Sequence, residues 1–272
     1  MEVTLLGTGD TTGTPTVGCD CDTCREAWDR GVERSRFSVH VRNEETDECL
    51  LIDASPDFRS QFLDNDVSLP DEVLITHIHF DHLDGLGNAY RLFDSLPVHA
   101  TGETDPKTDE SVADTIRDKF DYLDQITVHD REPLVSFSAC GFDVTFVPVE
   151  HPPLVCYGVI VENDGSKLAL TGDTGYSIPD ASREALSDAD LFLADAIVPA
   201  SLCEYHPAGG RHHTDDGVPR TFGYKHMTRE GALSLADELD AEVTRLVHVS
   251  HFYSEEEAFE EPLAVDGEQY RI

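Results

Sequence analysis

Short apolar runs separated by Gly, Pro and Asp recur along most of the chain. Runs of this kind that are rich in Val, Ile, Leu and Phe predict β-strands bounded by turns. The predicted strands are Val3–Leu6, Phe37–Val41, Cys49–Ile52, Glu72–Ile75, Val144–Val149, Tyr157–Val161, Lys167–Leu170, Leu191–Ala194 and Arg245–Val249.

Four other segments have apolar residues spaced three or four positions apart, which predicts helices. They are Asp57–Leu63, Asp109–Leu123, Ser182–Leu186 and Thr228–Leu239. In the last segment the apolar residues from Ala232 to Leu239 form one stripe behind an N-cap at Thr228. The strands form two groups with helices after each, so we expect an α/β fold with two packed sheets and helices outside. No linker is visible, so we expect a single domain over residues 1–272.

The composition is strongly acidic, with 55 Asp and Glu against 19 Lys and Arg and a formal net charge of −36. The carboxylates are spread between the apolar runs and 39% of residues are hydrophobic, which predicts a folded chain rather than a disordered one. This pattern resembles proteins of organisms that accumulate molar salt, where a Debye length of ~3 Å screens self-repulsion. Such a surface repels nucleic acid and anionic membranes.

The N-terminal run has no basic segment before it, and no segment reaches the ~20 apolar residues of a membrane span. Three of the seven cysteines lie together, at Cys19, Cys21 and Cys24, which suits metal binding in a reducing compartment better than disulfides. We therefore expect a cytoplasmic protein without a membrane partner. The other cysteines have apolar neighbours and are expected to be buried thiols: Cys49, Cys140, Cys156 and Cys203.

Several predicted strands end in, or close to, a residue that can bind a metal ion. These residues are His77 in "EVLITH", His151 in "VTFVPVEH", Asp173 in "KLALTGD" and His248 in "RLVHVSH". Strand ends at one edge of a sheet can direct side chains toward a common point.

The segment "THIHFDH" contains His77, His79, Asp81 and His82 within seven residues. Because side chains alternate along a strand, these four must lie on a loop or on the first turn of a helix, which "LDGLGNA" would continue. Imidazole suits zinc, iron and other first-row divalent ions, and a carboxylate adds charge. A set of polar loop histidines is the alternative, and the crowding of four such groups argues against it.

This motif is similar to that of the metallo-β-lactamase superfamily, and the resemblance covers nearly the whole chain. It implies an αββα four-layer sandwich with a dinuclear metal site between the sheets. The implied ligands are His77, His79 and His151 for one ion and Asp81, His82 and His248 for the other, with Asp173 bridging. Asp53 in "LLIDASPD" would contact these ligands without binding the metal and would hold them in place. Flavodiiron oxidoreductases of the superfamily have glutamate at position 79 and an added flavin domain, so His79 favours a hydrolase.

The cysteines of "GCDCDTC" supply three thiolates, and a closed structural zinc site needs a fourth ligand. His248 and His251 of "HVSH" are three residues apart, so one can face the active site and the other the cysteines. Together, "GTGDTTGTPTVGCDCDTC" and "HVSH" resemble the cyclic ribose phosphate phosphodiesterase family of the carbon-phosphorus lyase pathway. That resemblance implies one structural Zn²⁺ on Cys19, Cys21, Cys24 and His251, with the cysteines in a loop at about residues 16–28, and two active-site cations, Mn²⁺ or Zn²⁺.

The same resemblance matches His226, in "KHMTREGALSLADEL", to a histidine that assists the reaction. We expect catalytic roles for Asp81 and His226, and hydrolysis of a small phosphorylated substrate such as 5-phosphoribosyl 1,2-cyclic phosphate. Two divalent ions would activate water and stabilise phosphoryl charge, and His226 would protonate or hydrogen-bond the departing sugar oxygen. The oligomeric state is not readable from the sequence, and a homodimer is compatible with the family.

Three other functions remain open. "GTGDTTGTP" and His251-Phe252 are also similar to transfer RNA 3′-processing endonucleases, although RNA binding draws on Lys and Arg. A thioester or lactone hydrolase could use the same site. A non-catalytic metal-binding accessory protein, similar to those of pyrroloquinoline quinone biosynthesis, is the third. In residues 199–225, Arg211, His206, His212 and His213 either contact a substrate phosphate or decorate a loop.

Overall fold

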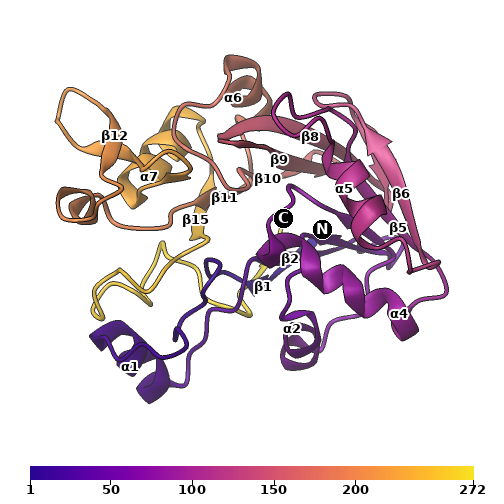
Figure 1. Cartoon of the computed structure of the whole chain (residues 1–272), viewed down its shortest axis with the longest axis horizontal. Coiled ribbons are helices and arrows are strands. Elements are labelled where there is room, and N and C mark those ends of the chain that lie inside the picture. Colours follow the sequence, from indigo (N-terminus) through magenta and orange to yellow (C-terminus); the bar gives the residue numbers. More distant parts are fainter.

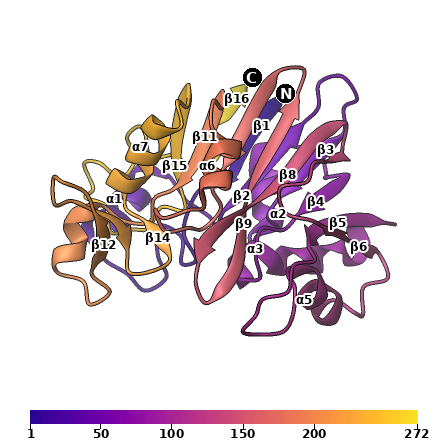
Figure 2. The ribbon, with the colours of Figure 1, turned by 90° about the horizontal axis from the view of Figure 1, so that it is seen from above.

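A computed structural model describes residues 1–272 and shows two large β-sheets packed face to face, with helices outside (Figures 1 and 2). The first sheet has the order β16 (Gln269–Arg271), β1 (Glu2–Gly7), β2 (Ser38–Arg42), β3 (Cys49–Ile52), β4 (Glu72–Leu74), β5 (Leu96–Thr101) and β6 (Ile126–Arg131). The second has the order β15 (Val243–Val247), β11 (Leu191–Asp195), β10 (Ser166–Leu170), β9 (Leu154–Asn163), β8 (Phe142–His151) and β7 (Phe137–Ala139). A small third sheet consists of β12 (Gly210–His213), β13 (Pro219–Phe222) and β14 (His226–Met227).

The helices are α1 (Asp22–Arg30), α2 (Phe58–Asn65), α3 (Phe80–Leu83), α4 (Ala89–Leu92), α5 (Val112–Lys119), α6 (Asp180–Leu186) and α7 (Arg229–Glu238), with 3₁₀ turns η1 (Asp84–Asn88) and η2 (Ala200–Glu204). Four of these helices form the two outer layers. The first sheet is contacted by α2 and α5, and the second by α6 and α7. The predicted four-layer α/β sandwich is therefore confirmed. None of these helices has the length and apolar character needed to span a membrane.

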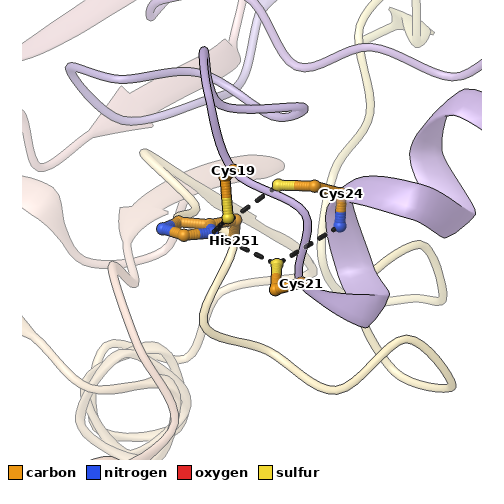
Figure 3. Close-up of side chains that lie close together, drawn as sticks. All are labelled: Cys19, Cys21, Cys24 and His251. Atoms are coloured by element: carbon orange, nitrogen blue, oxygen red, sulfur yellow. Dashed lines mark hydrogen bonds between the residues drawn. The ribbon is translucent and has the colours of Figure 1, made fainter.

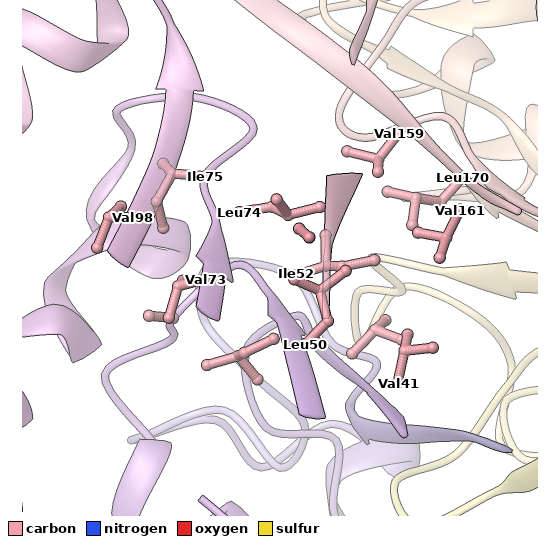
Figure 4. Packing of buried hydrophobic residues seen from close by; sticks show 14 of the residues in the cluster. Val41, Leu50, Ile52, Val73, Leu74, Ile75, Val98, Val159, Val161 and Leu170 are labelled. Atoms are coloured by element: carbon pink, nitrogen blue, oxygen red, sulfur yellow. The ribbon is translucent and has the colours of Figure 1, made fainter. Parts of the chain in front are cut away.

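Apolar side chains from the inner faces of both sheets fill the space between them. In Figure 4, Ile52 and Leu74 of the first sheet lie opposite Val159 and Leu170 of the second. All four are completely buried. The outer faces are covered as well, and Cys49–Ile52 is buried on both sides, which is why that strand is an uninterrupted apolar run.

The predicted strands all exist, with ends shifted by a few residues, and the four scattered cysteines are buried. Thr228 caps α7 as expected, because its hydroxyl accepts the Gly231 N–H at 3.0 Å. The helix predicted over Asp109–Leu123 is wrong at both ends. Ser111 forms a capping box with Asp114, so α5 begins only at Val112, and it ends at Lys119.

Other elements were not predicted. The segment at residues 16–28 is not all loop, because Cys21 caps α1 and the helix starts at Asp22. Strands β5 and β6 were missed because "LPVHAT" and "ITVHDR" interrupt their apolar residues with Pro, His and charged positions. The small sheet β12–β14 was missed because its strands have two to four mostly polar residues.

The strand directions place the functional residues. Strands β3, β4 and β5 run parallel, and so do β10, β11 and β15. The carboxyl ends of parallel strands meet at one edge of a sheet. Asp53, Thr76 and Asp173 follow such ends, Asp195 is the last residue of β11, and His248 follows β15 directly.

Candidate metal centres

One group of possible ligands consists of His77, His79, His151 and Asp173, whose ligand atoms all lie within 4.8 Å of one another. His79 Nδ1 lies 2.9 Å from His77 Nε2 and 3.3 Å from His151 Nε2. Ligands bound to one ion at about 2.0–2.1 Å are separated by roughly 2.8–3.4 Å for octahedral to tetrahedral angles. The spacing of these three nitrogens therefore fits a shared cation.

A second group consists of Asp81, His82 and His248. Two of its members lie close to Asp173 of the first group. Asp173 Oδ2 is 3.5 Å from His82 Nε2 and 3.4 Å from His248 Nε2. The same oxygen is 3.6 Å from His77 Nε2. Asp173 thus stands between the two groups, as the family resemblance implied for a bridging ligand. His79 is the N-cap of α3, so "THIHFDH" occupies the predicted loop and first helical turn.

Hydrogen bonds on the far side of the rings orient these histidines. His82 Nδ1–H donates to Asp53 Oδ2 at 2.6 Å, and Asp53 also accepts the Thr76 N–H and hydroxyl. His151 Nδ1–H donates to the Lys225 carbonyl at 3.0 Å. Such partners set the tautomer and leave Nε2 free for a metal ion.

The polar groups at the centre have too few partners among themselves. His82 Nε2 and both ring nitrogens of His248 are buried without a hydrogen bond. Burial opposes protonation of His248, yet the carboxylates of Asp173 and Asp81 raise its pKa to about 9. Burial also works against a proton on His82, and Asp173 and Asp53 raise its pKa well above the ordinary value. A buried site with this much negative charge demands positive charge, and the residues fit divalent cations.

The backbone around the site is held in uncommon conformations. Asp53 and His248 have φ angles of 59° and 56°, in the left-handed region. Such residues cost about 1–3 kcal/mol each and occur where surrounding structure needs a specific side-chain direction. Gly172, before Asp173, has φ 59°, and an added Cβ would lie 2.5 Å from the Tyr157 carbonyl oxygen.

His226, on β14, lies beside the second group. Its ring stacks on that of His248 with centroids 5.0 Å apart and an interplanar angle of 11°. Its Nδ1–H donates to Asp195 Oδ2 at 3.0 Å, and the same oxygen accepts the Thr174 N–H at 2.9 Å. Asp195 is 1% exposed, and its Oδ1 lies 3.7 Å from His248 Nδ1. Asp195 was not predicted from the sequence, although "LFLAD" carries the same signal, an apolar strand that ends in a possible ligand.

The cysteine cluster lies apart from these groups, beside α1 (Figure 3). His251 Nδ1 is 3.4 Å from the Sγ atoms of Cys19 and Cys21 and 3.6 Å from that of Cys24. A tetrahedral zinc ion with bonds of about 2.3 Å to sulfur and 2.0 Å to nitrogen separates these atoms by roughly 3.5 Å. Of the two histidines in "HVSH", His251 faces the cysteines and His248 faces the other site.

The histidines of residues 199–225 do not join any of these groups. His206 packs between the rings of Phe222 and Phe252. His212 Nδ1 lies 2.7 Å from the Thr221 hydroxyl, and His213 donates to the Gly217 carbonyl.

A domain family match covers most of this fold. The β-lactamase superfamily domain matches residues 49–249, which include both groups at the centre. The chain belongs to the β-lactamase superfamily. With the αββα sandwich and the clustered His and Asp side chains, it is a metal-dependent hydrolase of the metallo-β-lactamase type.

Proteins that are similar to this chain carry different functional names. A diphosphatase from the PhnP family is 29% identical, with a TM-score of 0.76 over 99% of this chain and 96% of that one. An octanoyltransferase of Porphyromonas gingivalis is 28% identical over 92% of this chain. The matched region is only 46% of the length of that octanoyltransferase. Zn²⁺-bound PqqB from Methylobacterium extorquens, at 22% identity and TM-score 0.78 over 100% of both chains, shares the fold.

Proposed function

We propose that this β-lactamase superfamily member is a phosphodiesterase that uses two divalent cations to hydrolyse a small cyclic phosphodiester, such as 5-phosphoribosyl 1,2-cyclic phosphate. The similarity to the PhnP-family diphosphatase supports a phosphorus-centred reaction. The observation that carries the proposal is the pair formed by His226 and buried Asp195 beside the metal ligands.

Each of the two groups of ligands would hold one cation. His77, His79 and His151 would hold one, Asp81, His82 and His248 the other, and Asp173 would touch both. When bound, Mn²⁺ or Zn²⁺ supplies a nucleophile at neutral pH and positive charge against the phosphoryl oxygens. Cys19, Cys21, Cys24 and His251 would hold a structural Zn²⁺.

His226 is suited to protonate the leaving group. Asp195 accepts its Nδ1–H, so the opposite nitrogen is free to carry a proton toward the centre. In the proposed reaction, water adds to phosphorus, one P–O ester bond breaks, and the departing sugar oxygen takes that proton. The product is a phosphate monoester with a free hydroxyl.

This pair also helps to choose among the functions that the fold allows. A sugar alkoxide is a poor leaving group that needs a proton, whereas a thiolate with a pKa near ~8.5 leaves without one. The pair therefore favours a phosphodiester over a thioester. The net charge of −36 argues against a long RNA substrate, whose binding depends on phosphate neutralisation by Lys and Arg. The thiol cluster requires reduced cysteines, which supports a place in the cytoplasm.

A phosphorus NMR time course with 5-phosphoribosyl 1,2-cyclic phosphate tests the proposal, in ~2 M KCl with Mn²⁺ to screen the acidic surface. We expect conversion to ribose 1,5-bisphosphate and none with Asp173→Ala. His226→Ala should keep its metal content and lose at least about 100-fold in kcat, because general acid catalysis contributes about 10²–10⁴.

His213→Ala is the matched control, since His213 is an exposed histidine on the same small sheet. Metal analysis of the purified protein should give three ions per chain. No conversion by folded protein with three ions bound would reject this substrate, and full activity of His226→Ala would remove His226 from the mechanism.

A further inference from the structure

Lys225 differs from the other cationic side chains of this acidic protein. It is half-buried, yet its ammonium forms no hydrogen bond and no ion pair. The other buried or half-buried cations all have partners. Arg34 and Lys167, for example, donate to main-chain carbonyl groups, and Arg131 donates to His99. With 55 carboxylates against 19 cations, an unpaired lysine at such a position is exceptional.

The main chain of Lys225 is fixed at the metal centre. Its carbonyl oxygen accepts the Nδ1–H of His151 at 3.0 Å, and the next residue is His226. Lys225 is thus anchored directly beside His151 and His226, and its unpaired ammonium extends from that point.

The small sheet places a second cation near Lys225. Arg211 of β12 pairs with Thr221 of β13, and its guanidinium lies 3.5 Å from the ring centroid of Tyr224. Arg211 is exposed and has no carboxylate within 4.0 Å. Two cations without a carboxylate partner therefore lie at this turn: Lys225 itself and Arg211, which stacks on Tyr224. Elsewhere the protein surface repels anions.

We propose that Lys225 binds an anionic group of the substrate other than the phosphodiester that is cleaved. This inference rests on the proposed function and assigns to it a residue that determines substrate specificity. A lysine ammonium on a flexible four-carbon stem, with three donors, suits a phosphate that must be reached from the rim of the site. Arg211 adds a second positive charge on the same small sheet.

The test compares two substrates in constant KCl and Mn²⁺. One is 5-phosphoribosyl 1,2-cyclic phosphate, which has a terminal phosphate, and the other is bis(p-nitrophenyl) phosphate, which has none. For Lys225→Gln we expect the ratio of kcat/KM between the first and the second substrate to fall about 10- to 100-fold, mainly through KM. Lys225→Arg should restore most of the ratio. Lys107→Gln is the control, because Lys107 is exposed and unpaired but lies on another loop.

An equal loss for both substrates, or an unchanged ratio, would overturn the proposal. Failure of the proposed function is seen separately, as absence of turnover in the wild type. In that case, calorimetry with ribose 5-phosphate on the Mn²⁺-loaded protein decides about Lys225. At least tenfold weaker binding by Lys225→Gln supports the site, and equal binding, or none to either protein, rejects it.

Discussion

Replacing Asp195 by asparagine isolates what its negative charge does for His226. The asparagine oxygen can occupy the place of Oδ2, 2.9 Å from Thr174 N and 3.0 Å from His226 Nδ1. Both hydrogen bonds therefore keep their geometry. The amide NH₂ then replaces Oδ1, which lies 3.7 Å from His248 Nδ1. That group is a donor in a buried place where an acceptor is needed.

The expected cost has two parts. A hydrogen bond to a charged partner contributes about 1.5–3 kcal/mol, against about 0.5–1.5 kcal/mol for a neutral one. The hydrogen bond that orients the His226 ring is therefore weakened by about 1–1.5 kcal/mol. Loss of the carboxylate charge beside the imidazolium form of His226, with a buried unsatisfied donor, adds about 1–1.5 kcal/mol. Together these predict a kcat lower by about 30- to 150-fold.

The assay is the phosphorus NMR time course, run beside metal analysis and thermal unfolding of each variant. Asp190→Asn is the matched control, because Asp190 lies just before β11, at the other end of that strand, and its carboxylate accepts only the Lys167 N–H. A kcat within about twofold of the wild type would refute the assigned role of Asp195. A loss of active-site metal in Asp195→Asn would instead show that Asp195 acts on His248.

Two further predictions concern stability. Cys24→Ser should lose about one zinc ion per chain and have a lower melting temperature, because Cys24 is buried in the cluster that connects α1 to His251. The control is Cys140→Ser, which changes another buried cysteine and should keep its zinc. Unchanged zinc content in Cys24→Ser would contradict the assignment. Burial lowers the pKa of His40 from its ordinary value of 6.5 to about 4. As the pH falls below 6.5, His40 therefore takes up a proton in the unfolded chain before it does so in the folded protein. The free energy of unfolding of the protein should fall by about 1.4 kcal/mol between pH 8 and pH 5.5 because of this residue. Urea unfolding in constant KCl should show this loss reduced in His40→Gln, and an identical pH dependence in both proteins would rule it out.

Local spacing was sufficient for much of the site. "THIHFDH" places four possible ligands within seven residues, and the apolar strands that end in or close to His151, Asp173 and His248 indicated where further ligands lie. Strand positions were predicted for the same reason, since buried parallel strands are apolar on both faces. Short or polar strands such as β6 and β12 leave no such periodicity and were missed.

Other features depend on contacts between distant parts of the chain. The spacing in "HVSH" allowed either histidine to face the cysteines, and only the path of the chain after β15 directs His251 to them and His248 to Asp173. Lys225 has ordinary sequence surroundings, and the apolar strand that ends in Asp195 does not reveal which histidine this carboxylate contacts. Both become functional candidates through what packing places beside them. Residue types and local periodicity are properties of neighbours along the chain, so the ligand set and the strands can be predicted from them. Which carboxylate orients which histidine, and which lysine stays unpaired, is decided by the packing of two sheets and the small third one.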